Sequence, residues 1–326
     1  MNPSQTPFTQ ALACYKRGDH HQAMLLCRQH LDDANSVYVL GLIAADARQY
    51  DESIRLMDAA LSIQPDHAEA ALDRSRILTQ SNKAKLQLGL ALHQQSALVA
   101  AASVYQEILG SDPYHFDALQ LLGALAVQLE VYDSAIQLLD RALALNSNHA
   151  DAHSNRGIAL QELGWLADAL ACYDQALSLK SHNPQIHNNR GNTLKELHRL
   201  EDALASYDEA LALCPDYVDA LSNRGSTLAA LNRLDEALAS YDQALAIDPA
   251  STRTGYNRAN LLRDMNRFDE ALAAYDQVLL LNPQFAMAYN NRGLILQDMG
   301  RLEEALASFE QALALQGVSS YNEGAT

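Results

Sequence analysis

Apolar residues recur along most of the chain at helical spacing, in blocks that repeat every 34 residues. The segments LEDALASYDEALALCP from Leu200 and LDEALASYDQALAIDP from Leu234 show one such block in two successive copies. A second amphipathic block lies just upstream of each, read as NNRGNTL and SNRGSTL. Apolar positions separated by three and four residues are typical of helices with one buried face. The pattern therefore predicts an all-α chain built from pairs of helices.

Each 34-residue unit holds particular residue types at fixed places, numbered here from position 1 at Asn82. Position 8 is a small residue such as Gly191, position 20 is alanine such as Ala203, and position 24 is mostly aromatic, as in Tyr207. Proline at position 32, as in Pro215, ends the second helix. This pattern resembles the tetratricopeptide repeat. The resemblance implies a right-handed superhelical solenoid of antiparallel helix pairs, with the aromatic residue filling the space between repeats.

The register of the repeats divides the chain into four parts. We expect two divergent repeats in residues 4–67, an irregular inserted helix in residues 68–81, seven repeats in 34-residue phase in residues 82–317, and a flexible tail in residues 318–326. The segment 68–81 is either an extra helix or the start of one long helix that runs to Leu92. No polar capping helix is evident after Leu315, so the last repeat offers a surface for end-to-end self-association.

The charge balance excludes several classes of function. The chain has 40 acidic and 23 basic residues, a formal net charge of −17. Nucleic-acid binding is not expected, because phosphate contacts need clustered lysine and arginine. No apolar run is long enough for a transmembrane helix and the first residues do not form a secretory signal, so we expect no membrane insertion. Four cysteines without a C-x-x-C pair fit a cytoplasmic location.

Catalytic signatures are missing from the sequence. It contains no phosphate-binding loop, no nucleophile elbow and no H-E-x-x-H motif, and the repeats take up nearly its whole length. We therefore expect no enzyme activity and no cofactor. His149 and His153 are four residues apart, but they fall in a loop and at the start of the next helix, so packing is favoured over metal binding.

Asparagine stands at position 6 of five successive repeats, although it is a poor residue for a helix interior. In the resembled fold this position lines the concave face, where an amide can bond both the C=O and the N–H groups of an extended peptide. The alternative interpretation is that these residues are solvated products of repeat duplication. The predicted peptide-binding groove comprises Asn155, Asn188, Asn189, Asn192, Asn223, Asn257, Asn260, Asn290 and Asn291.

The favoured function is thus a scaffold that binds a protein or an extended peptide through an asparagine-lined groove. Similar asparagine ladders line the repeat arm of protein O-linked N-acetylglucosamine transferases, and the N-R-G blocks resemble bacterial members of that arm. This resemblance implies an alternative function, in which the chain is the substrate-targeting arm of such a glycosyltransferase and lacks its catalytic domain.

Arginine occupies position 7 of five repeats and a matching place in the segment 68–81. Each of these arginines follows an aspartate by 16 residues, whereas Gln106, which replaces the acid, is followed by Leu122. This correlation predicts six salt bridges, each from the second helix of one repeat to the first helix of the next, because the guanidinium fork suits a carboxylate. The predicted pairs are Asp58–Arg74, Asp140–Arg156, Asp174–Arg190, Asp208–Arg224, Asp242–Arg258 and Asp276–Arg292.

Overall fold

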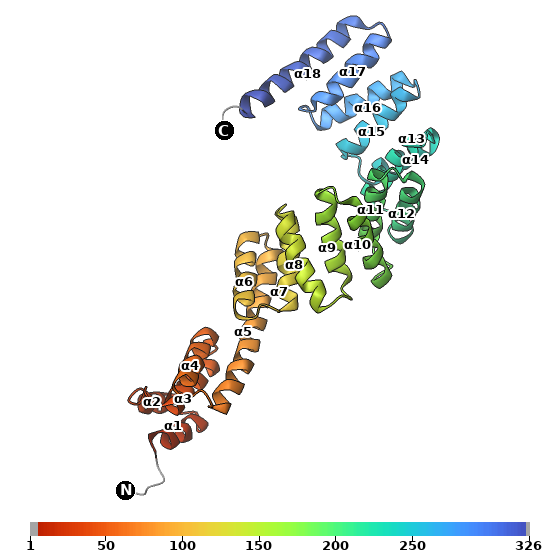
Figure 1. Ribbon diagram of the computed structural model, residues 1–326. Helices are drawn as coiled ribbons and strands as arrows, with labels where there is room; N and C mark the ends of the chain where they lie inside the picture. The colour runs from red at the N-terminus through yellow and green to blue at the C-terminus, as the bar shows by residue number, and fades with distance from the viewer. Residues whose placement is uncertain (1–5, 324–326) are drawn as a thin grey trace. The chain divides into compact units, whose positions relative to one another are not determined.

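The computed structural model describes the backbone of residues 6–323 and the side chains of residues 6–315. Within these bounds the chain forms eighteen α-helices and no β-strand, which confirms the all-α prediction (Figure 1). The chain divides into two compact units, Met1–Leu129 and Glu130–Thr326, and each is a solenoid of helices that pack on their neighbours in sequence.

The first unit contains seven helices in the described residues. They are α1 (Pro7–Lys16), α2 (His20–Cys27), α3 (Ala34–Asp46), α4 (Tyr50–Ile63), α5 (Ala68–Gln94), α6 (Leu98–Ser111) and α7 (Phe116–Gln128).

The second unit contains the remaining eleven helices of the described chain. They are α8 (Tyr132–Leu145), α9 (Ala150–Glu162), α10 (Leu166–Leu179), α11 (Pro184–Glu196), α12 (Leu200–Leu213), α13 (Val218–Ala230), α14 (Leu234–Ile247), α15 (Thr252–Asp264), α16 (Phe268–Leu281), α17 (Ala286–Asp298) and α18 (Leu302–Glu323).

The turn between the two helices of a repeat has a fixed conformation. Its residue at position 15 adopts positive φ, with values of 59° at His198 and Asn232 and 77° at Gly164. Glycine reaches this left-handed region without strain, and asparagine tolerates it better than most residues. These turns reverse the chain and set the two helices of each repeat side by side.

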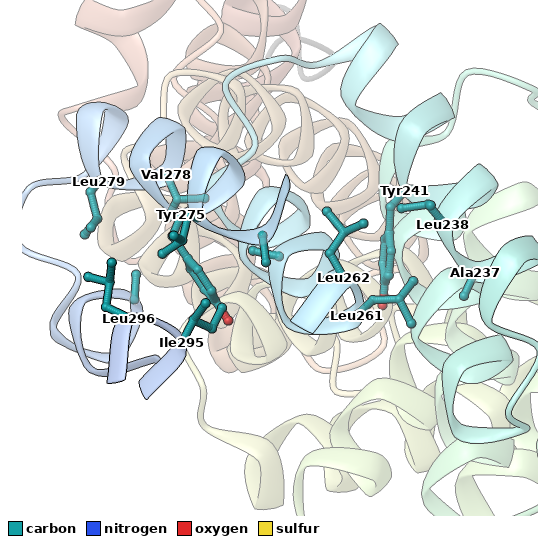
Figure 2. Packing of buried hydrophobic residues seen from close by; sticks show 14 of the residues in the cluster. Ala237, Leu238, Tyr241, Leu261, Leu262, Tyr275, Val278, Leu279, Ile295 and Leu296 are labelled. Atoms are coloured by element: carbon teal, nitrogen blue, oxygen red, sulfur yellow. The ribbon is translucent and has the colours of Figure 1, made fainter. Parts of the chain in front are cut away.

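Glycine at position 8 sets how closely those two helices approach. A Cβ atom added at Gly157 would lie 2.8 Å from the ring of Tyr173, and one added at Gly225 would lie 2.7 Å from the ring of Tyr241. The aromatic ring therefore packs on the first helix of its own repeat, and not only between repeats as the sequence suggested. Contact with the next repeat also occurs, since Tyr275 shares a buried cluster with Ile295 of α17 (Figure 2).

Residues 68–81 belong to one continuous helix, which is the second of the two forms left open by the sequence. Helix α5 runs for 27 residues and packs on both α4 and α6. Its first twenty-one residues contain neither proline nor glycine, so nothing in the sequence ends the helix before Gly89, and a single glycine is tolerated inside a helix.

Residues 318–323, which the sequence analysis assigned to a flexible tail, form the last turns of α18. Helix α18 has 22 residues, whereas the second helices α10, α12, α14 and α16 each have 14. The segment carries no proline at position 32 to end it, and a single glycine, Gly317, is tolerated inside a helix. Residues 4–5 and 324–326 of the expected divisions lie outside the described residues.

Candidate functional site

A pocket of about 410 Å³ in the second unit brings together two of the predicted groove residues, Asn155 and Asn189. They stand at position 6 of the first helices α9 and α11, one repeat apart. Ile158 and Tyr217 supply apolar surface to the same pocket, and the buried Ile186 lies beneath it. The rest of its lining is polar and consists of Asp151, Ser154, Asn183 and Gln185.

The side-chain amides of Asn155 and Asn189 make no hydrogen bond to any other residue in the described part of the chain, and the same holds for Asn257. All three side chains are half-buried. Each amide therefore keeps one acceptor and two donors for a bound molecule. An amide of this kind can pair with the N–H and C=O groups of a peptide backbone.

Other asparagines of the predicted groove are already engaged within the protein. Asn223 donates through Nδ2 to Oδ1 of Asn188 at 3.0 Å, and Asn188 is only 5% exposed. The hydroxyl of Tyr207 donates to Oδ1 of Asn192 at 2.8 Å. These amides join neighbouring helices of the solenoid and have less capacity for a ligand.

The same holds further along the unit. Asn291 donates through Nδ2 to the hydroxyl of Tyr256 and to Oδ1 of Asn260, both at 2.9 Å. The hydroxyl of Tyr275 also donates to Oδ1 of Asn260. Asn290 is exposed. The asparagine row is therefore mixed, with engaged amides between free ones.

Basic and acidic residues that the sequence analysis did not single out lie on the same first helices. Arg253 donates to Asp219 at 2.6 Å, and Lys195 donates to Oγ of Ser226 at 2.7 Å. Burial lowers the pKa of Lys195, and the positive charge of Arg253 adds to the effect. The Asp219–Arg253 pair had a signal in the sequence, since both residues stand at position 2 of successive repeats.

All six predicted aspartate–arginine pairs lie together in the structure. In five of them the arginine Nε is 2.6–2.7 Å from the aspartate Oδ1, and Arg74 contacts Asp58 in the same way. In those five pairs the arginine side chains are 23–27% exposed and the aspartates 51–58%. Because both partners reach solvent, each pair contributes only about 0–1 kcal/mol to stability.

Four of these arginines reach a third helix. The Nη1 atom donates to Oγ of Ser206, Ser240 or Ser308 at 2.6–2.7 Å, and in one repeat to Sγ of Cys172 at 2.9 Å. Each acceptor stands at position 23, in the second helix of the arginine's own repeat. The arginine therefore joins two second helices through the first helix between them. Sequence reasoning missed this contact because the spacing analysis followed only acidic partners.

The first unit has a more apolar pocket, of about 340 Å³, on α1, α3 and the start of α5. Its rings include Phe8, Tyr15 and Tyr38. The hydroxyl of Tyr38 donates to Asp73 at 2.8 Å, and burial together with this bond raises the pKa of Tyr38. The lining of this pocket is therefore mainly apolar, unlike that of the pocket on α9 and α11.

Neither a metal centre nor a membrane span is found in the described residues. No three or more histidine, cysteine or acidic side chains gather there in a way that could hold a metal ion. None of the described helices combines the length and the apolar character that crossing a bilayer requires.

Comparison with known proteins gives a consistent result. A tetratricopeptide repeat model matches residues 38–86, 188–252 and 256–319, and a second TPR repeat model matches residues 123–164 and 162–198. No curated protein matches the chain.

Solved structures show the same fold at low sequence identity. A tetratricopeptide repeat protein from Parabacteroides merdae is 20% identical, with a TM-score of 0.58 over 72% of this chain and 93% of that one. PilF of Pseudomonas aeruginosa is 22% identical, with a TM-score of 0.55 over 63% of this chain and 97% of that one. The matched models cover more than half of the sequence, and the chain therefore belongs to the tetratricopeptide repeat family.

Proposed function

We propose that the chain is a non-catalytic scaffold that binds an extended peptide segment of a partner protein along the first helices of its second unit. The observation that carries this proposal is the pocket on α9 and α11, where the amides of Asn155 and Asn189 are both free of internal bonds. The tetratricopeptide repeat fold supports a role in protein interaction.

The lining of this pocket suits a peptide backbone together with one apolar side chain. The two amides pair with main-chain groups, while Ile158 and Tyr217 accept an apolar side chain. Asp151 in the lining and the net charge of −17 disfavour acidic segments. A neutral or basic segment is therefore the expected ligand.

A library of random nonapeptides, displayed on phage and selected on the full chain, tests this proposal. Peptides selected on the native protein should bind the double variant Asn155→Ala, Asn189→Ala at least about tenfold more weakly, because two hydrogen bonds are lost. The matched control is Asn290→Ala, an exposed asparagine outside the pocket.

Equal affinity of the selected peptides for the double variant and the native chain would overturn the assignment of the site. Circular dichroism of both variants shows whether helix content is preserved, as expected, since alanine is the better helix former.

A further inference from the structure

One face of α18 carries two exposed leucines, Leu306 and Leu313, whereas the leucines at the same repeat positions of α16 are buried. Leu306 and Leu313 are 59% and 70% exposed. The residues at the same two positions of α16, Leu272 and Leu279, are 7% and 8% exposed. The difference arises because α17 packs on α16, whereas no helix follows α18 in the described residues.

The internal interface shows what this kind of face accepts. Leu272 and Leu279 share a cluster with Ala288, Ile295 and Leu296 of α17, and all three of these are fully buried. Figure 2 shows Leu279 with Ile295 and Leu296. Next to this apolar contact, Nε of Arg292 in α17 lies 2.7 Å from Asp276 of α16. The contact therefore combines an apolar stripe with one arginine–carboxylate pair.

Helix α18 retains both parts of that combination. Glu310 stands at position 25, the place that Asp276 has in α16. It is exposed and has no ion-pair partner in the described part of the chain. An apolar stripe beside an unpaired carboxylate is complementary to a helix that carries an apolar stripe beside an arginine.

We propose that this face of α18 binds an amphipathic helix of a partner protein that has the features of α17. Such a helix carries a small residue four positions before an arginine and apolar residues three and four positions after it. This face is separate from the pocket that contains Asn155 and Asn189, because it lies on α18 whereas that pocket lies on α9 and α11.

A second copy of this chain fits the same face less well. Its first helix, α1, has Gln10 at position 7 in place of arginine, and Thr9 and Ala13 are exposed on it. A contact between two copies of α18 would bring their acidic residues together, including Glu303, Glu304 and Glu310. Charge complementarity thus favours a partner with arginine over the end-to-end self-association expected from the sequence.

A stapled peptide with the sequence of residues 286–298 is a direct probe. The staple replaces Asn290 and Leu294, which are one turn apart and exposed in α17, so the interacting face is kept and the peptide is held helical. Fluorescence anisotropy with the full chain should show saturable binding. Leu306→Asp should weaken it at least tenfold, and the matched control Leu280→Asp, at a 74% exposed leucine of α16, should not.

A charge exchange tests the specific pairing. Glu310→Lys should weaken binding of the native-sequence peptide about three- to tenfold, and a peptide with Arg292→Glu should recover affinity for that variant. Absence of saturable binding, or equal binding by the native and Arg292→Glu peptides, would overturn the proposal. Self-association in sedimentation that is lost in Leu306→Asp but kept in Glu310→Lys would assign the face to a second copy instead.

Discussion

Arg224 donates a 2.7 Å hydrogen bond through Nη1 to Oγ of Ser240, a side chain that is only 1% exposed. The serine hydroxyl in turn donates to the carbonyl of Glu236. Through Nε the same arginine holds Asp208 at 2.7 Å. One guanidinium thus joins α12, α13 and α14. Its ion pair with Asp208 is too exposed to add much to the free energy of unfolding by itself.

Loss of this arginine should cost more than loss of an arginine that lacks the serine contact. Arg258 is the matched control, since it pairs with Asp242 but has Ala274 at the place of the serine. We expect Arg224→Ala to lower the free energy of unfolding by about 1 kcal/mol more than Arg258→Ala, because it also removes a bond to a buried hydroxyl. Urea denaturation followed at 222 nm measures the difference. Equal losses would show that the serine contact adds nothing.

A methyl group at position 8 should be unfavourable wherever an aromatic ring faces it. Gly225→Ala places a Cβ 2.7 Å from the Tyr241 ring, and we expect a loss of about 1–3 kcal/mol from overpacking. Gly110 in α6 has nothing within 4 Å of an added Cβ, so Gly110→Ala should be neutral or stabilise by up to about 1 kcal/mol.

Thermal and urea unfolding of these two glycine variants should therefore change in opposite directions. Ala259 stands opposite Tyr275 in one native repeat, which shows that this interface can be rebuilt around a methyl group and keeps the expected cost moderate. A Gly225→Ala variant as stable as the native chain would contradict this account.

Two asparagines at the same position of successive repeats should respond differently to alanine. Asn223→Ala leaves the buried Oδ1 of Asn188 without its donor and should destabilise by about 1 kcal/mol. Asn257 has no internal partner in the described residues, so Asn257→Ala should be neutral or stabilise by up to about 0.7 kcal/mol through helix propensity. Similar changes in both variants would argue against an inter-repeat role for Asn223.

Alkaline pH should unfold the chain through its buried tyrosines. Burial raises the pKa of Tyr241 and Tyr275 to about 12, against about 10 in an unfolded chain. The protonated hydroxyls favour the folded state, so this contribution is complete below about pH 10 and is lost as the pH rises towards 12. Absorbance at 295 nm and ellipticity at 222 nm should change together over this range.

The variant Tyr241→Phe provides the control for this titration. It lacks one group that must ionise on unfolding, so its alkaline midpoint should lie at higher pH than that of the native chain. A tyrosine titration completed near pH 10, with helicity intact, would contradict the interpretation.

The 34-residue period was sufficient to predict the helix pairs, because it fixes which residues share a face. The aspartate–arginine pairs were also accessible, since Gln106 and Leu122 depart from the pattern together. The state of each groove amide was harder to predict, because it depends on the preceding repeat. Asn223 donates to Asn188, and Asn291 donates to Tyr256. Each of these acceptors stands at position 5 of the preceding repeat.

Asn189 and Asn257 instead follow repeats with a serine at position 5, Ser154 and Ser222. A serine side chain is shorter than asparagine or tyrosine, and neither asparagine bonds to it in the structure. For Asn189 and Asn257 the free amide thus coincides with a small residue at the neighbouring position, whereas Asn155 is free although Gln120 stands there. The end of α18 could not be predicted from the sequence either, because the 34-residue pattern does not indicate a second helix that is longer than those of the other repeats.

The continuous helix α5 changes how the first unit can come apart. A solenoid can open at a repeat boundary, because each repeat touches only its neighbours and a turn separates them. No such turn interrupts α5 between the part that packs on α4 and the part that packs on α6, and Lys85 of α5 contacts both Asp51 of α4 and Glu107 of α6. Opening the stack here requires breaking a helix or leaving half of it without a partner. We therefore expect the helices that pack on the two ends of α5 to fold and unfold together, as one cooperative unit.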